Sequence, residues 1–287
     1  MTKSPGRCIA CGDAAGDRFR AGGVEIRRCA GCGLAWRGVF PEAAEIADLY
    51  GEDYFERWGI DAPSRLAEVR AMKEASYRAF FGEIMAHRGG GRLLDLGCAL
   101  GFLLGVARDL GFEVRGLDLN EAAITEAQQE FGDHVHAGPL DERAFPGERF
   151  DVVTLIDVLE HVPDPSALLA SIAARLAPDG VAAAVLPDTG SLTARLLGRR
   201  WPHYNAEHLY YWSASNLTHF LEREGWQVRF VRRGLRKTFT AHYLDHYARR
   251  LGRRLVPGLG ALGGLRLRIP TGEMLLIASP RPTAEQA

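Results

Sequence analysis

The sequence predicts an α/β fold with a mostly parallel sheet, preceded by a small cysteine module of the zinc-ribbon type. Three features predict it. Short apolar runs alternate with helical periods from Gly91 onward, as in successive strand–helix–strand units. The string LLDLGCALG, from Leu93 to Gly101, has the form of a strand that leads through a tight turn into a helix. Two CxxC pairs stand near the start, at Cys8, Cys11, Cys29 and Cys32.

The chain of 287 residues is 47% hydrophobic, which is enough for one full α/β core and a small module. We expect a cysteine module at residues 1–40, a helical linker or cap at 41–90 and the α/β domain at 91–287, with a basic insertion at 235–271. The sequence contains no long uncharged apolar run and begins with polar residues. We therefore expect a cytoplasmic protein.

The cysteine spacing favours a metal site over disulfides. Two CxxC knuckles separated by 17 residues supply the four ligands of a tetrahedral zinc ion. Four thiolates close the coordination shell, so Cys8, Cys11, Cys29 and Cys32 are predicted to hold a structural Zn²⁺ rather than a catalytic one. A redox dithiol is the disfavoured alternative, since two matched pairs exceed what redox chemistry needs.

The order of elements follows from the pattern of apolar runs and helix caps. Asn120 is expected to cap one helix, and Ser213 stands at the start of another. We expect strands at 92–96, 113–117, 134–137, 150–156, 181–186, 226–231 and 273–278, and helices at 101–110, 120–131, 164–176 and 213–224.

The carboxyl ends of such strands are where ligands bind. Gly97 and Gly101 would let the backbone approach a ligand closely. Asp118 ends the second strand 23 residues after Asp95 and would accept hydrogen bonds from both hydroxyls of a ribose. The dinucleotide fingerprint GxGxxG is absent, and a carboxylate at Asp95 does not suit a pyrophosphate. The cationic, phosphate-free S-adenosylmethionine fits these residues better.

The strings DLGCALG, GLDLN and FDVVTLIDVLEHVPDP resemble motifs I, II and IV of class I S-adenosylmethionine-dependent methyltransferases. The resemblance implies a seven-stranded Rossmann-like sheet and methyl transfer. Ala99 stands where the family usually has a glycine. By this resemblance the cofactor would lie against Asp95, Gly97, Cys98, Gly101, Asp118, Leu119, Leu140 and Asp157, with Asp118 at the ribose, Leu140 or Asp141 near the adenine and Asp157 facing the methionine part.

Two histidine segments could supply a base. The chain lacks the Asn/Asp-Pro-Pro-Tyr motif of many amino-group methyltransferases, which leaves a hydroxyl oxygen or an activated carbon as acceptor. His161 follows the fourth strand and would approach the sulfonium or cap the next helix. Glu207 and His208 form either an enclosed acid/base pair or a set of partners for backbone groups. We keep His208, Glu207 and His161 as catalytic candidates.

A second resemblance involves the whole order of motifs. CxxC pairs, a Tyr-x-x-x-Tyr segment at Tyr50 and Tyr54, the core motifs and the string EHLYYWS are similar to the zinc-containing nucleotide-sugar C-methyltransferases of deoxysugar pathways. It implies an acid/base role for Glu207 and His208 and a sugar, glycan or natural-product acceptor. Because the chain ends near the end of the predicted core, we expect sugar or glycan methylation as a class rather than C-methylation.

The C-terminal third is basic, with fifteen Arg or Lys against four Asp or Glu between Arg195 and Arg268. An amphipathic helix from Tyr243 to Leu255 would serve as a lid, hold a nucleotide- or lipid-linked substrate, or rest on an anionic bilayer. Two other functions stay open: an RNA methyltransferase, disfavoured because the cysteine module carries few basic residues, and a non-catalytic, zinc-anchored binding module.

Overall fold

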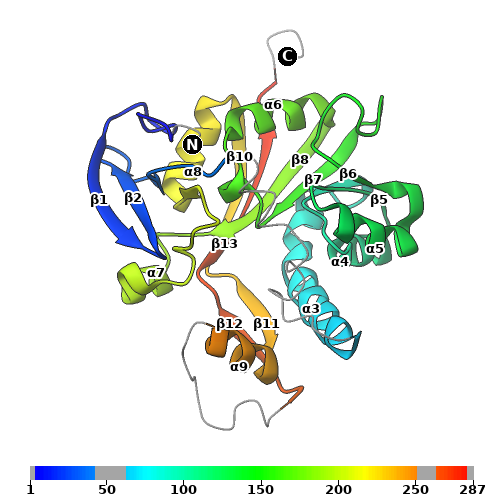
Figure 1. The fold of residues 1–287 in the computed structure, drawn as a ribbon. Helices are drawn as coiled ribbons and strands as arrows, with labels where there is room; N and C mark the ends of the chain where they lie inside the picture. Colours follow the sequence, from blue (N-terminus) through cyan, green and yellow to red (C-terminus); the bar gives the residue numbers. More distant parts are fainter. Residues whose placement is uncertain (1–3, 43–62, 251–262, 283–287) are drawn as a thin grey trace.

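The computed structural model of the chain describes residues 4–42, 63–250 and 263–282 (Figure 1). Its main sheet has seven strands in the order β10-β13-β8-β7-β4-β5-β6. Strand β13 pairs antiparallel with both of its neighbours, and the other pairings are parallel. The strands are β4 (Gly91–Leu96), β5 (Phe112–Asp118), β6 (Val135–Ala137), β7 (Phe150–Ile156), β8 (Leu176–Pro187), β10 (Trp226–Arg233) and β13 (Glu273–Pro280). The predicted α/β sheet of seven strands is confirmed.

Helices α3 (Pro63–His87), α4 (Phe102–Asp109) and α5 (Glu121–Phe131) cover one face of this sheet, and α6 (Pro165–Arg175) and α8 (Ala214–Arg223) cover the other. Helix α7 (Leu192–Leu197) contacts the 3₁₀ turn η3 (Gly198–Arg200), and α9 (Ala241–Arg250) lies in the basic insertion. Two further 3₁₀ turns are η1 (Gly132–His134) and η2 (Leu159–His161). Successive strand residues enter different cores: Val152 packs with α3, α4 and α5, whereas Val153 packs with α6 and α8. Because both faces of the sheet are buried in apolar cores, the strands read as continuous apolar runs.

The helix starts follow the capping residues. The side chain of Asn120 accepts a hydrogen bond from the N–H of Ala123 at 2.9 Å. Asp164 does the same for Ala167 at 3.0 Å. The helix predicted from Gly101 begins one residue later, because Gly101 has a left-handed backbone.

A second sheet contains the cysteine module. Strands β1 (Ala15–Ala21), β2 (Val24–Cys29) and β3 (Ala35–Arg37) are followed in the sheet by β9 (Tyr210–Tyr211), which belongs to a distant part of the sequence. Figure 1 shows β1 and β2 at one edge of the molecule. The module packs on the same core as α6 and α8.

The basic insertion contains a hairpin that the sequence analysis did not predict. Strands β11 (Arg236–Thr240) and β12 (Arg266–Pro270) pair antiparallel, and α9 follows β11 (Figure 1). The expected helix from Tyr243 continues to Leu255, but Leu251 and Leu255 lie outside the described residues, as do Tyr50 and Tyr54. Among the described residues, no helix is both long and apolar enough to cross a membrane.

Candidate active site

A cavity of about 840 Å³ lies at the carboxyl ends of β4, β5 and β7. Seven of the eight predicted cofactor residues line it, while Gly101 ends the turn that forms one wall. Helix α3 adds two residues that the sequence analysis did not select, Lys73 and Tyr77. The predicted residues in the lining are Asp95, Gly97, Cys98, Asp118, Leu119, Leu140 and Asp157.

The turn between β4 and α4 has three residues in the left-handed region. They are Gly97 (φ 76°), Ala99 (φ 45°) and Gly101 (φ 74°). A Cβ atom at Gly97 would lie 2.6 Å from a methyl carbon of Val158, and one at Gly101 would lie 2.5 Å from the ring of Phe131. Both positions therefore require glycine. Ala99 adopts the same backbone region at a cost of about 1–2 kcal/mol.

Asp118 is held at the rim of the cavity by backbone amides. Its carboxylate accepts hydrogen bonds from the N–H groups of Ala99 and Asn120, each at 2.8 Å. A carboxylate oxygen has two lone pairs, so each oxygen keeps capacity for a ligand hydroxyl. Burial raises the pKa of Asp118 against the opposing effect of these amides. The neighbouring Leu119 is 62% exposed at the same rim.

Asp95 lies deeper in the cavity wall. The hydroxyl of Thr154 donates to its carboxyl group at 2.6 Å. Burial raises the pKa of Asp95 to about 7, and the nearby Asp118 adds to the shift. A group with this pKa changes charge readily when a cationic ligand arrives.

Asp157 forms a partly buried ion pair with a residue of the basic insertion. The ammonium group of Lys237 lies 3.0 Å from the Asp157 carboxylate and 2.6 Å from that of Glu273. Burial alone would raise the pKa of Asp157, but the charges of Lys237 and Lys73 outweigh burial and hold this pKa well below its usual value. Asp157 also has a left-handed backbone, with φ 56°. Lys237 is a residue that the sequence analysis missed.

Three histidines gather beside this cavity. His161 lines the cavity, and its ring centroid lies 4.7 Å from that of His208. His203 stacks on the other side of His208, with centroids 6.3 Å apart. Burial lowers the pKa of all three imidazoles, so they are neutral at pH 7. The structure thus brings both candidate bases, His161 and His208, into one cluster.

The carboxyl group nearest to His208 is that of Glu160, not that of Glu207. Oε1 of Glu160 lies 4.0 Å from Nε2 of His208. Glu160 is 1% exposed, and within the described part of the chain its two oxygens have no hydrogen-bond partner. Burial raises the pKa of Glu160 well above its usual value. Glu207 is exposed, and its backbone carbonyl is hydrogen-bonded to Nδ1 of His161 at 3.0 Å.

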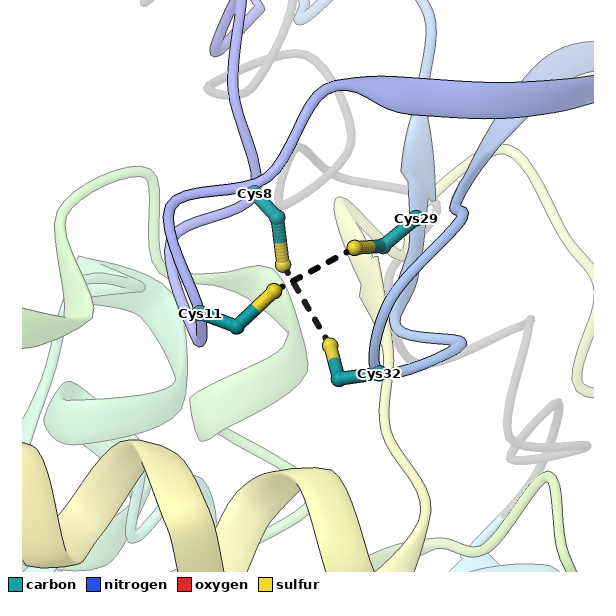
Figure 2. Close-up of side chains that lie close together, drawn as sticks. All are labelled: Cys8, Cys11, Cys29 and Cys32. Carbon is teal, nitrogen blue, oxygen red and sulfur yellow. Dashed lines mark hydrogen bonds between the residues drawn. The ribbon is translucent and has the colours of Figure 1, made fainter.

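The four predicted zinc ligands converge on one point, although they come from separate knuckles. Figure 2 shows their sulfur atoms directed toward one another. The sulfurs of Cys8 and Cys32 are 3.5 Å apart, and those of Cys11 and Cys29 are 3.3 Å apart. Four thiolates 2.3 Å from a tetrahedral zinc ion stand about 3.8 Å from one another. The cluster therefore needs only a small expansion to hold the ion.

The thiol groups of this cluster differ in acidity. Burial raises the pKa of Cys32 to about 11 and that of Cys8 still further. Burial alone would raise the pKa of Cys29, but hydrogen bonds from the backbone and from neighbouring thiols outweigh burial and lower this pKa to about 7. A bound cation offsets the cost of ionising buried thiols, so the donor set fits a zinc ion.

Comparison with known proteins identifies the family. The family described as "Methyltransferase domain" matches residues 66–231, more than half of the chain. The chain belongs to this family. It is an S-adenosylmethionine-dependent methyltransferase, with the turn, the acidic rim and the sheet order described above.

Curated relatives of this methyltransferase act on oxygen. A ubiquinone biosynthesis O-methyltransferase of Thiobacillus denitrificans is 34% identical over 146 residues, which are 48% of this chain and 60% of that protein. A protein of the same name from Bradyrhizobium diazoefficiens is 32% identical over 157 residues, or 50% of this chain and 61% of that protein. The matched region thus covers less than two thirds of either relative.

Solved structures show the same fold. The magnesium protoporphyrin IX methyltransferase of Synechocystis PCC 6803 has a TM-score of 0.53 at 17% identity and covers 84% of this chain and 100% of that one. A methyltransferase of Haloferax volcanii, solved with the Trm112 activator, has a TM-score of 0.55 at 15% identity, covering 83% and 98% of the two chains.

Several basic residues of the C-terminal third of this methyltransferase form ion pairs with acidic residues of the same chain. Arg232 binds Glu83 at 2.7 Å, and Arg233 binds the buried Asp188 at 2.6 Å. Lys237 is the buried partner of Asp157 described above. These cations are paired with acidic side chains of the same protein, which leaves fewer of them for an anionic partner on this surface.

Proposed function

We propose that this methyltransferase transfers the methyl group of S-adenosylmethionine to a hydroxyl oxygen of a small-molecule acceptor, with a buried imidazole as proton acceptor. The observation that carries the proposal is the position of His161, which lines the same cavity as Asp95 and Asp118 and packs against His208.

The cofactor residues have complementary tasks. S-adenosylmethionine, when bound, supplies an electrophilic methyl group on a sulfonium. Asp118 accepts hydrogen bonds from the ribose hydroxyls, and the apolar side chains of Leu119 and Leu140 cover the adenine. Asp95 offers a carboxylate to the cationic amino-acid portion. Gly97, Cys98, Gly101 and Asp157 complete the wall around that portion.

An oxygen acceptor is supported by the base and by the relatives. A hydroxyl must lose its proton during methyl transfer, and a neutral imidazole within reach is a suitable acceptor for it. Burial keeps His161 and His208 neutral at pH 7. The curated relatives are named O-methyltransferases. A sugar, glycan or natural-product hydroxyl, whether or not linked to a nucleotide or lipid, must likewise lose its proton during methyl transfer.

We also propose that Cys8, Cys11, Cys29 and Cys32 hold a structural zinc ion. The four sulfurs leave no coordination position for water or substrate. The ion would stabilise a module that is too small to fold on a hydrophobic core alone.

The test is methyl transfer from S-adenosylmethionine labelled in its methyl carbon to a panel of catechols and nucleotide sugars. We expect an O-methyl signal in the carbon NMR spectrum of the product. His208→Ala or His161→Ala should lower kcat by about 10²- to 10⁴-fold without changing cofactor affinity. His219→Ala, on the exposed face of α8, is the matched control. A C-methyl product, turnover only on RNA, or wild-type kcat in both histidine variants would contradict the proposal.

A further inference from the structure

The cysteine module holds the chain segment that carries His208. Strand β3 pairs with β9 in antiparallel register. One step beyond this pairing, the backbone N–H of Arg37 donates to the carbonyl of Leu209 at 2.8 Å. The guanidinium of Arg37 donates to the carbonyl of Ala206 at 2.7 Å. Arg37 therefore binds the chain on both sides of His208.

The same segment is held from the opposite side by the turn η2. The N–H of Leu209 donates to the carbonyl of Glu160 at 2.8 Å. Nδ1 of His161 lies 3.0 Å from the carbonyl of Glu207 and is hydrogen-bonded to it. The backbone that carries His208 thus lies between β3 and η2 and is hydrogen-bonded to both.

The cysteine cluster fixes the start of β3. Cys32 lies three residues before this strand, and the N–H of Cys29 donates to the carbonyl of Leu34 at 2.8 Å. On the other knuckle, Arg223 of α8 donates to the carbonyl of Ala10 at 2.6 Å. The shared core that buries Trp36 supports β3 from one side, and the cysteine cluster constrains the turn from which β3 starts.

We propose that Arg37 is a positioning residue for methyl transfer, through which the zinc-bound module sets where His208 stands relative to the cofactor cavity. The inference rests on the proposed function, with His208, which packs against His161, as the imidazole that accepts the proton. Among the described residues that line the cavity, Arg37 is absent, so it acts through the backbone that it binds. A displacement of a reacting group by about 1 Å costs on the order of 100-fold in rate.

The experiment compares Arg37→Ala, Arg37→Lys and a control in the same sheet. Arg18→Ala is the control, because Arg18 is 64% exposed and pairs only loosely with Glu25 at 3.8 Å. Amide hydrogen exchange, measured by mass spectrometry on the full chain, gives the rate at which the backbone of residues 206–211 opens to solvent. Bound zinc, cofactor affinity by calorimetry, and kcat and KM on the acceptor found in the panel are measured on each variant.

We expect Arg37→Ala to speed exchange in residues 206–211 by about tenfold or more, with β4 unaffected. We also expect kcat to fall by at least about tenfold, while zinc content and the KM for S-adenosylmethionine stay at wild-type values. Arg37→Lys keeps one donor and should lie between Arg37→Ala and the wild type. Arg18→Ala should match the wild type.

Wild-type exchange of residues 206–211 in Arg37→Ala, or a loss of kcat without faster exchange, would overturn the proposal. If Arg37→Ala fails to fold, zinc removal from the wild-type chain replaces it, and unchanged exchange of 206–211 then overturns the proposal. Wild-type kcat in His208→Ala would instead contradict the function assigned to His208, while faster exchange in Arg37→Ala would still show the hold on the segment.

Discussion

Lys237 forms an ion pair of 3.0 Å with Asp157, which lines the cavity at the carboxyl ends of β4, β5 and β7. The two residues come from the basic insertion and from the end of strand β7, so the pair joins the insertion to the main sheet. Lys237 also binds Glu273 at 2.6 Å, and one ammonium group therefore balances two carboxylates.

Removing this ammonium group should destabilise the fold strongly. We expect Lys237→Met to lower the free energy of unfolding by about 3–5 kcal/mol at pH 7, because it removes the ammonium partner of the buried Glu273 and of the partly buried Asp157. The folded-state pKa of Asp157 is lowered, so its stabilising contribution is present above the unfolded value of about 3.9 and is lost as pH falls through the folded value. The deficit should therefore shrink in strong acid. Urea unfolding measures it, with Arg18→Met as an exposed control; equal midpoints for the wild type and Lys237→Met at pH 7 would contradict it.

Asp118 and Asp141 offer a matched pair of variants for the cofactor site. Asp118→Ala should weaken S-adenosylmethionine binding by about 100-fold or more, since two hydrogen bonds from ribose hydroxyls to a carboxylate are lost. Asp141→Ala should have little effect, because Asp141 is paired with Arg143 at 2.7 Å outside the cavity lining. Calorimetry on both variants checks this, and equal affinities would move the ribose away from Asp118.

Ala99 offers a stabilising change inside the site. Ala99→Gly should raise the free energy of unfolding by about 0.5–1 kcal/mol, because glycine adopts a φ of 45° without strain and this relief exceeds its entropic cost. Ala107→Gly, inside helix α4, should lower it by about 1 kcal/mol. Chemical denaturation of the two variants tests the difference, and a loss of stability in Ala99→Gly would show that the turn is not strained.

Glu160 should make stability depend on pH. Its folded-state pKa is raised, so its contribution is fully present below the unfolded value of about 4.3 and is lost as pH rises toward the folded value, by up to about 1.4 kcal/mol per pH unit. Glu160→Gln has no proton to lose and should be more stable than the wild type at pH 8 but not at pH 4. Denaturation midpoints at the two pH values measure this, and Glu207→Gln, at an exposed site, is the control. The same difference at both pH values would mean that Glu160 is ionised and balanced by a cation.

The fold could be predicted where its signals are local in sequence. Asn120 and Asp164 cap helices through amides three residues away, and the glycine turn needs only its own backbone geometry. Strand β9 gave no such signal, because it is two residues long and its partner β3 lies about 175 residues earlier. The hairpin of β11 and β12 was missed for a similar reason, since a long intervening segment separates its strands.

The residues of the candidate site likewise fall into those with a local sequence signal and those whose position depends on distant parts of the chain. Asp95 and Asp118 could be found because motif spacing places them at the ends of neighbouring strands. Glu160 was within a recognised string, but its position beside His208 depends on how η2 meets the segment before β9. Lys237 reaches Asp157 from a hairpin 80 residues away, and an alternating basic strand in the sequence does not reveal which face is buried.

The late pairing of β3 with β9 also has a consequence during synthesis. The ribosome must add about 175 residues after Ala35 before Tyr211 exists to complete the four-stranded sheet. At elongation speeds of about 5–20 residues per second this takes on the order of ten to thirty seconds. Throughout that interval the nascent amino terminus exposes an unpaired strand edge beside four thiols, so early metal capture would protect it from oxidation and from pairing with other chains.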